Sequence, residues 1–207
     1  MKLSKEEETN KEHYDKNALP WAKQRCRFSD HLRDFEEFQR LLPGGKIVDL
    51  GCGTGRDSQP FTSAGYEYVG VDLSEGMIGQ AKKSFPDLDF EVMNLLDLKI
   101  KDESFDGIWS FAAYLHIPKD SINRAMQEAY RVLKPGGIGY VVVKKGSKEC
   151  YLDSKQGKRY WSFYGKNQFA EVLKNNGFKI LKSWEDRRDY DPPDDVSIYL
   201  CYFIQRT

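Results

Sequence analysis

The feature that most constrains the fold of this chain is a short apolar stretch with a carboxylate near its end. Three glycines at alternate positions follow it directly. It reads IVDLGCGTG and extends from Ile47 to Gly55. Because glycine has no Cβ and readily adopts positive φ, such a loop lets a ligand lie against bare backbone. Asp49 narrows the ligand class, since a carboxylate at a strand tip repels a pyrophosphate and attracts a cation.

The composition is that of a balanced globular protein and predicts a single domain. The 207 residues include 32 Lys and Arg against 32 Asp and Glu, so the formal net charge is zero. This balance gives no reason to expect nucleic acid or an anionic membrane as a partner. The expected partner is a small-molecule substrate, and the composition leaves the oligomeric state open.

The cysteines and histidines predict neither a disulfide framework nor a metal site. Four cysteines, at Cys26, Cys52, Cys150 and Cys201, are scattered without a CxxC pair, and the three histidines lie far apart. Free thiols are typical of a reducing compartment, so we expect a cytoplasmic protein. No stretch approaches the roughly 20 apolar residues of a membrane span.

Strand and helix patterns alternate along most of the chain. Strands are predicted at 46–50, 66–71, 88–93, 105–110, 138–143, 178–184 and 196–204, and helices at 28–42, 56–64, 74–84, 119–133 and 167–176. Ser74 is the expected N-cap of its helix. This alternation predicts an α/β domain with a mainly parallel sheet. The last two strands have no helix between them, so we expect them to pair antiparallel at one edge.

Two segments depart from this alternation. Residues 1–12 are rich in Lys and Glu and are predicted to be a flexible N-terminal segment. The domain then spans 13–207, with N-terminal cap helices at 13–42. Residues 145–165 are polar but carry several aromatic side chains, and they follow the fifth strand. They are expected either to form a lid over the carboxyl edge of the sheet or simply to connect two elements.

The glycine spacing separates two ligand classes. A dinucleotide site uses G-x-G-x-x-G, whereas the glycines here fall at 51, 53 and 55, and Arg56 takes the sixth position. Asp72 follows the second predicted strand, 21 residues after Gly51. A carboxylate at this place can accept both hydroxyls of an adenosine ribose. Alone, it would equally suit a helix cap or a surface charge.

With these motifs the chain resembles the class I S-adenosylmethionine-dependent methyltransferases over nearly its whole length. The segments that carry the resemblance are VDLGCGTGRD from Val48, GVDLSEGMIGQAK from Gly70, FDGIWSFAAYLHIP from Phe105 and LKPGG from Leu133. The family implies a single three-layer αβα sandwich with a seven-stranded, mostly parallel sheet. Its strand order is 3-2-1-4-5-7-6, with strand 7 antiparallel.

The resemblance implies S-adenosyl-L-methionine as cofactor and S-adenosyl-L-homocysteine as product. The donor carries a sulfonium and an ammonium, which agrees with Asp49. Backbone at the glycine loop would meet the methionine portion, Asp72 the ribose, and Leu73 and Met77 the adenine. In the family an acidic residue after strand three accepts the adenine amino group, and here that position is Asn94, with Asp97 as a second candidate. The implied cofactor-binding residues are Asp49, Gly51, Cys52, Gly53, Thr54, Gly55, Arg56, Asp72, Leu73, Met77, Asn94, Leu95, Ser110 and Phe111.

The resemblance also locates candidates for the methyl-transfer chemistry. His116 is a candidate general base, Tyr114 lies on the same loop, and Tyr14 belongs to a Tyr-x-x-x-Ala-x-x-aromatic pattern. Each of the three could instead be a packing residue. Lys144, Arg159 and Tyr160 would bind an anionic acceptor or else be solvated.

The predicted function is therefore S-adenosylmethionine-dependent transfer of a methyl group to a small molecule by direct in-line displacement. Because the sulfonium already activates the methyl group, alignment and exclusion of water can supply most of the rate. Oxygen, nitrogen, sulfur and metalloid acceptors stay open. The alternative is a nucleoside-binding protein without transfer activity, and the glycine spacing disfavours a nicotinamide oxidoreductase.

Overall fold

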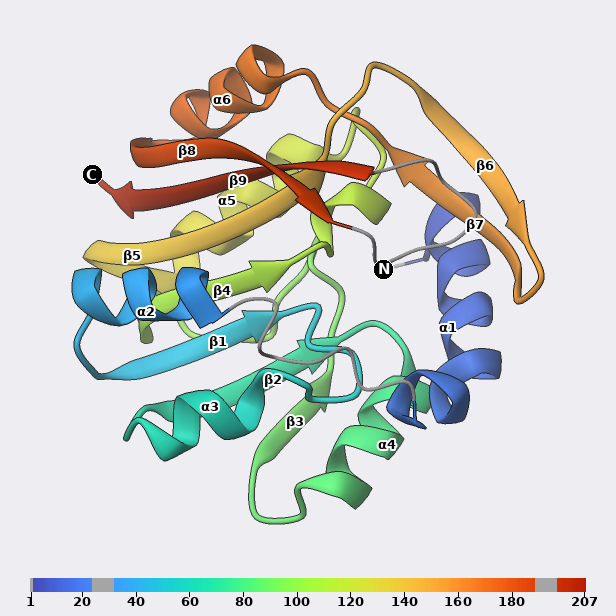
Figure 1. Cartoon of the computed structure of the whole chain (residues 1–207), viewed down its shortest axis with the longest axis horizontal. Helices are drawn as coiled ribbons and strands as arrows, with labels where there is room; N and C mark the ends of the chain where they lie inside the picture. The colour runs from blue at the N-terminus through green and yellow to red at the C-terminus, as the bar shows by residue number, and fades with distance from the viewer. Residues whose placement is uncertain (1, 24–31, 189–196) are drawn as a thin grey trace.

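The computed structural model describes residues 2–23, 32–188 and 197–207, and Figure 1 shows the arrangement of the elements. Cys26, Phe28 and Val196, which entered the sequence predictions, lie outside these residues. The helices are α1 Lys5–Lys23, α2 Leu32–Leu41, α3 Ser58–Ser63, α4 Glu75–Ser84, the 3-10 turn η2 Tyr114–His116, α5 Ile122–Val132 and α6 Lys166–Asn175. The strands are β1 Lys46–Leu50, β2 Glu67–Asp72, β3 Asp89–Val92, β4 Phe105–Phe111, β5 Leu133–Lys144, β6 Glu149–Ser154, β7 Gly157–Ser162, β8 Phe178–Arg188 and β9 Ser197–Arg206.

One large sheet runs through the molecule. Within the described residues its seven strands have the order β3-β2-β1-β4-β5-β9-β8. Strands β1 to β5 are parallel, and β9 pairs antiparallel with both β5 and β8. When β6 and β7, which pair only with each other, are set aside, this is the predicted order 3-2-1-4-5-7-6 with an antiparallel seventh strand. The fold prediction is confirmed.

Helices cover both faces of the sheet (Figure 1). On one face, Phe38 of α2 and Phe61 of α3 make T-shaped contacts with Trp109 of β4, at centroid distances of 5.5 and 5.2 Å. On the other face, Phe169 of α6 packs on Tyr202 of β9 at 5.4 Å. Edge-to-face aromatic pairs add about 0.5–1.5 kcal/mol each beyond the burial of their area. These rings fix the sheet on which the glycine loop is mounted.

The N-terminal segment differs from its prediction. Residues 1–12 were expected to be flexible, but α1 begins at Lys5, and Glu7 and Asn10 are buried. The Asn10 side chain accepts a hydrogen bond from Tyr160 N at 2.8 Å and donates to Tyr160 O at 3.2 Å. Ser4 and Glu7 form a reciprocal capping box at the start of the helix, with bonds of 3.2 and 2.8 Å. The prediction was wrong because α1 buries polar side chains that find partners.

Asp15 connects α1 to the start of α4. Its Oδ1 accepts hydrogen bonds from Ser74 Oγ at 2.6 Å and Gly76 N at 2.9 Å, while Oδ2 pairs with Lys11 at 2.8 Å. Ser74 also accepts from Met77 N at 3.0 Å, which confirms it as the N-cap of α4. The helix α1 is thereby held at the carboxyl end of β2.

Residues 145–165 contain the β6–β7 hairpin, which lies beside α1 (Figure 1). Asn17 Nδ2 donates to Gln156 O at 3.0 Å, and the Tyr151 hydroxyl donates to Glu6 at 2.9 Å. Arg159, Tyr160, Trp161 and Ser162 of β7 are all buried, so both faces of this part of the strand are covered by the rest of the molecule. The hairpin and α1 therefore form one hydrogen-bonded layer.

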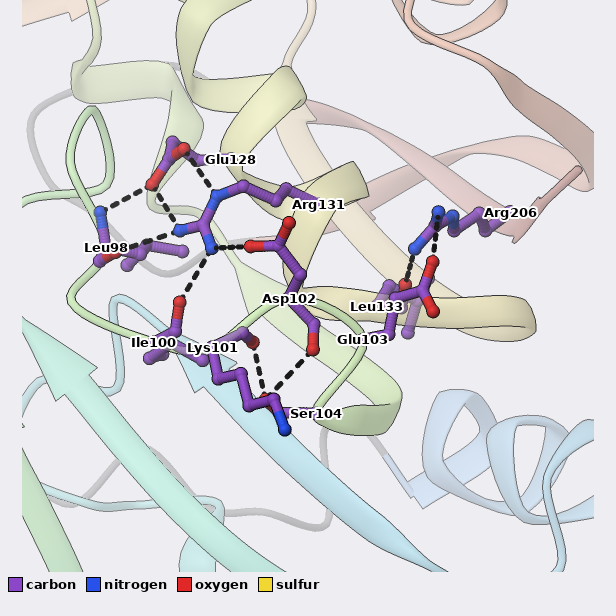
Figure 2. A network of polar contacts seen from close by, with 10 residues as sticks. All are labelled: Leu98, Ile100, Lys101, Asp102, Glu103, Ser104, Glu128, Arg131, Leu133 and Arg206. Atoms are coloured by element: carbon purple, nitrogen blue, oxygen red, sulfur yellow. Dashed lines mark hydrogen bonds and ion pairs between the residues drawn. The ribbon is translucent and has the colours of Figure 1, made fainter.

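A guanidinium holds the long connection between β3 and β4, as Figure 2 shows. Arg131 of α5 donates to Ile100 O at 2.6 Å and Leu98 O at 2.9 Å, and pairs with Asp102 at 2.6 Å. Glu128 accepts from the same guanidinium at 2.8 and 2.9 Å. The Arg131 side chain thus gives hydrogen bonds to two backbone carbonyls of this loop that have no partner in regular secondary structure.

Candidate functional site

The glycine loop is attached to the end of β2. Gly51 N and Cys52 N both donate to Val71 O, at 2.8 and 3.0 Å. Gly51 and Gly53 have φ angles of 83° and 56°, a region that favours glycine. A Cβ on Gly51 would lie 2.2 Å from the Ala113 Cβ, whereas a Cβ on Gly53 would meet nothing within 4 Å. Gly51 is therefore required by packing, and Gly53 leaves an open wall.

Asp72 lies at the tip of β2 and organises this wall. Its Oδ2 accepts from Gly53 N at 3.0 Å and its Oδ1 accepts from Ser74 N at 2.9 Å. Burial raises the pKa of the Asp72 carboxyl. Each carboxylate oxygen retains a lone pair beyond its backbone bond, so Asp72 can still accept hydroxyl donors.

A second group of carboxylates lies behind the loop. Asp49 is 3% exposed and accepts the Tyr68 hydroxyl at 2.7 Å. Its pKa is raised by burial and by the neighbouring charge of Asp57. Asp57 accepts Trp109 Nε1 at 2.8 Å and is paired with Arg56 at 2.7 Å. Two buried carboxylates beside one guanidinium make this wall suitable for a cation.

These walls enclose a cavity of about 570 Å³ at the carboxyl edge of the sheet. Its lining brings together the following residues of the predicted site: Tyr14, Asp49, Gly51, Cys52, Gly53, Thr54, Arg56, Asp72, Leu73, Met77, Asn94, Leu95, Phe111, His116 and Arg159. The cavity is thus shared by most of the predicted cofactor residues, by Tyr14 and His116, and by one of the predicted acceptor-binding cations.

Five other predicted residues do not belong to this lining. They are Gly55, Ser110, Tyr114, Lys144 and Tyr160. Ser110 is fully buried and donates to Leu50 O at 2.8 Å. The η2 turn points His116 toward the cavity and buries Tyr114 in the core, where burial raises the pKa of its hydroxyl. Gly55 packs near Phe85 and Phe90.

Tyr14 and His116 form a hydrogen-bonded pair inside the cavity. The Tyr14 hydroxyl lies 2.7 Å from His116 Nε2, and His116 Nδ1 lies 2.9 Å from Tyr160 O. Because a carbonyl only accepts, Nδ1 carries the proton and Nε2 accepts from Tyr14. Burial lowers the pKa of His116 to about 3, so the imidazole stays neutral at physiological pH. Tyr160 acts here through its backbone.

The side chain of Asn94 was expected to accept a hydrogen bond from adenine, but it bonds to other residues of the protein. Its Oδ1 accepts from Leu96 N at 2.8 Å, and its Nδ2 donates to Glu7 Oε1 at 2.7 Å. Glu7 lines the same cavity and was missed because residues 1–12 were taken as flexible. The alternative candidate, Asp97, pairs with Lys99 at 2.8 Å and is outside the lining.

Other lining residues were also missed. Besides the predicted Tyr14, one face of α1 contributes Glu7, Asn10, Lys11 and Trp21 to the cavity. Their spacing of three, four and seven residues is that of a helical stripe and was readable in the sequence. Trp161 and Tyr199 enter from β7 and β9. These two residues could be assigned to the cavity only from the tertiary packing.

Several structural findings bear on other ligand classes. Among the residues that the structure describes, no group of three or more His, Cys, Asp or Glu side chains is placed to hold a metal ion. None of the helices in the described ranges is long and apolar enough to cross a membrane. Cys52 and Cys150 are free thiols.

Comparisons with known proteins agree with this geometry. A family model described as "Methyltransferase domain" matches residues 47–137. An uncharacterized protein of Methanocaldococcus jannaschii is 30% identical over 174 residues, with 80% of both chains covered. A demethylmenaquinone methyltransferase of Renibacterium salmoninarum is 34% identical over 96 residues, covering 46% of this chain and 40% of the relative.

A solved structure of a SAM-dependent methyltransferase from Methanosarcina mazei superposes with a TM-score of 0.71 at 20% identity, covering 78% of this chain and 92% of that one. The chain spans half or less of the length of the first curated relatives it matches. The matched segment includes the glycine loop, Asp49 and Asp72, and the superposition agrees with the fold described above. The chain belongs to the class I S-adenosylmethionine-dependent methyltransferase family.

Proposed function

We propose that the protein transfers a methyl group from S-adenosyl-L-methionine to a small-molecule acceptor. The observation that carries this proposal is the acidic, glycine-walled cavity in which Asp72 bridges Gly53 N and Ser74 N. The donor contains an adenosine ribose, a sulfonium and an ammonium but no phosphate. Hydroxyl-accepting Asp72 and cation-accepting Asp49 match these groups, and the open wall at Gly53 admits them.

Particular residues would hold each part of the donor. Gly51 and Gly53 would present backbone to the methionine portion, with Asp49 drawing its positive charge. Asp72 would accept the ribose hydroxyls. Leu73 and Met77, both lining residues, would pack against adenine, with Asn94 and Glu7 at its polar edge.

Methyl transfer from this donor needs no covalent bond between the protein and the methyl group. Bound S-adenosylmethionine supplies a methyl group whose bond to sulfur breaks as an acceptor lone pair attacks, and the bonding electrons return to sulfur as a thioether. The enclosed cavity would align the acceptor and exclude water. Tyr14, oriented by His116, directs its oxygen into the same space.

Turnover tests the proposal directly. The protein is incubated with methyl-labelled S-adenosylmethionine and a pool of small metabolites, and S-adenosylhomocysteine and labelled products are measured. We expect acceptor-dependent product from the wild type and at least about tenfold less from Asp72→Asn, because a charged hydrogen bond to the ribose is lost. Binding of the nucleoside without turnover on any acceptor would favour a binding protein instead.

We further propose that the protein works in the cytoplasm without nucleic acid as a partner. The free thiols of Cys52 and Cys150 support a reducing compartment, and the zero net charge supports a small-molecule partner. Recovery of the protein in an oxidising compartment, or salt-sensitive binding to RNA, would contradict this.

A further inference from the structure

The strand order determines on which side of Asp72 the base of a bound donor lies. Asp72 ends β2, and β2 lies between β1 and β3 in the sheet. The glycine loop follows β1, and Asn94 follows β3. A donor whose ribose meets Asp72 and whose methionine portion meets the glycine loop therefore extends its base toward the β3 side. Apolar side chains of the cavity lining are available there to cover a ring, namely Leu73, Met77 and Leu95.

Asn94 is the first polar side chain after β3, and both ends of its amide are bonded to the protein. Its Oδ1 accepts from Leu96 N at 2.8 Å inside its own turn, and its Nδ2 donates to Glu7 Oε1 at 2.7 Å. The exocyclic amino group of adenine is a donor, so it needs an acceptor from the protein. The amide oxygen of Asn94 is directed to its own turn, whereas the carboxylate of Glu7 lies next to it and is the stronger acceptor.

Glu7 brings a buried carboxylate to this part of the cavity from α1. The residue is 7% exposed and belongs to the cavity lining. Its Oε2 accepts from Ser4 N at 2.8 Å, and its Oε1 accepts from Asn94. Because a carboxylate has about four lone-pair positions, each oxygen can accept one more hydrogen bond. A buried carboxylate gains from a further donor and is destabilised by another acceptor facing it.

The position of Glu7 is fixed because α1 is anchored beside the ribose site. Asp15 of α1 accepts from Ser74 Oγ at 2.6 Å, and Ser74 N donates to Asp72. A Cβ on Gly76 would lie 2.8 Å from Asp15 O, so α1 approaches α4 as closely as a glycine allows. Glu7 lies eight residues before Asp15, which is about 12 Å along a helix. The helix α1 thus extends from the ribose side of the site to the β3 side.

We propose that Glu7 selects the base of the methyl donor by accepting a hydrogen bond from the exocyclic amino group of adenine. This rests on the proposed function, which places the ribose at Asp72. Nucleobase specificity then comes from α1, and Asn94 positions the Glu7 carboxylate. A base with a carbonyl oxygen in place of the amino group would turn an acceptor toward this carboxylate and would be rejected.

Two nucleosides that differ at one group test this proposal. S-inosylhomocysteine carries a carbonyl oxygen where S-adenosylhomocysteine carries the amino group, and calorimetric titration measures the affinity of the protein for each. The wild type should bind S-adenosylhomocysteine at least about tenfold more tightly, because the other ligand loses a hydrogen bond to a charged group. Equal affinities would overturn this proposal and leave the proposed function standing. Absence of binding by both ligands would contradict the proposed function and this proposal together.

Glu7→Gln tests whether the preference comes from this carboxylate. An amide can donate to the carbonyl oxygen as well as accept from the amino group, so the preference should fall below about threefold. The ratio compares two ligands on one protein, so a loss of stability alone does not change it. Glu8→Gln removes the same charge from an exposed neighbour outside the lining and should keep the wild-type ratio. A wild-type preference that persists in Glu7→Gln contradicts the assignment.

Asn94→Ala separates the role of Asn94 from that of Glu7. Without the amide, the Glu7 carboxylate keeps its charge and its bond to Ser4 N, so this variant should still prefer S-adenosylhomocysteine by more than about threefold. Loss of the preference in Asn94→Ala, together with its retention in Glu7→Gln, would assign recognition of the base to Asn94 and overturn the proposal.

Discussion

The Tyr14 hydroxyl and His116 Nε2 are 2.7 Å apart, which joins α1 to the loop after β4 inside the cavity. The imidazole is fixed from its other side by Tyr160 O, so its tautomer is set by the hairpin. The Tyr14 hydroxyl therefore donates to His116, and its oxygen can still accept a hydrogen bond from another group. The pair connects α1 to the η2 turn on the wall of the cavity.

Removing the Tyr14 hydroxyl should weaken this connection. Tyr14→Phe leaves His116 Nε2 without its donor, and we expect a loss of about 1–2 kcal/mol in the free energy of unfolding. Urea denaturation followed by circular dichroism measures it. Tyr151→Phe removes a peripheral hydroxyl bonded to Glu6 and serves as a control. Equal stability of wild type and Tyr14→Phe would show that the pair contributes nothing.

His116 should make the stability depend on pH. Its pKa is lowered to about 3 in the folded protein, so between the unfolded value near 6.5 and 3 the unfolded chain binds a proton that the folded protein does not. Stability contributed by the neutral imidazole is therefore present above pH 6.5 and is lost as the pH falls.

His116→Gln replaces the imidazole with an amide, whose oxygen can accept a hydrogen bond from Tyr14 but which does not titrate. The decrease in unfolding free energy from pH 7.5 to 4.5 should be smaller in this variant, by up to about 2.7 kcal/mol. The raised pKa values of Asp49 and Asp72 act in the opposite direction but are common to both proteins and cancel in the comparison. Parallel pH profiles would refute a neutral buried His116.

Substitutions at two glycines of the loop should have different effects, one mainly on stability and the other mainly on binding. Gly51→Ala places a Cβ 2.2 Å from Ala113 at a φ of 83°, and we expect a loss of about 2–4 kcal/mol. Gly53→Ala meets open space at a φ of 56°, so it should cost only about 1 kcal/mol and weaken S-adenosylhomocysteine binding instead.

Gly79 provides the control for these substitutions. It lies within α4 with open space around it, so Gly79→Ala should raise stability by about 0.5–1 kcal/mol. Thermal unfolding of the three variants, with and without the nucleoside, gives the comparison. A Gly51→Ala protein as stable as wild type would mean that the loop does not pack as described.

The fold was largely predictable because its signals are local. The bounds of β1 match the prediction, and Ser74 caps α4 as expected, since apolar runs and capping residues act over a few positions. The start of α1 was not predicted, because its buried face carries Glu7 and Asn10, and hydrophobic patterning detects only apolar burial. The capping box of Ser4 and Glu7 was the available signal.

The site was predictable where residues are adjacent to strand ends. Asp49 and Asp72 follow from the rule that parallel strands present their carboxyl ends together. Glu7 and Trp161 reach the cavity from elements distant in sequence, and only tertiary contacts reveal them. Asn94 illustrates the limit, because its partner lies 87 residues away.

Arg131 offers a test of the fold away from the cavity. Arg131→Ala removes bonds to Leu98 O, Ile100 O and Glu128 together (Figure 2), and we expect a loss of about 2–4 kcal/mol because buried carbonyls lose their donors. Binding of S-adenosylhomocysteine at low temperature should be unchanged. Arg40→Ala, which removes an exposed pair with Glu37, should leave the unfolding transition in place. A nucleoside affinity that falls with Arg131 would show that the loop supports the site.

Calorimetric titration with S-adenosylhomocysteine measures directly whether this cavity binds the methyl donor. The wild type should bind one equivalent with a Kd of about 10 μM or tighter, and Asp72→Asn should bind at least about tenfold more weakly. Asp97→Asn, which alters a loop carboxylate outside the cavity lining, should bind like the wild type. Absence of binding to the wild type, or equal affinity in Asp72→Asn, would contradict the assignment of this cavity to the methyl donor.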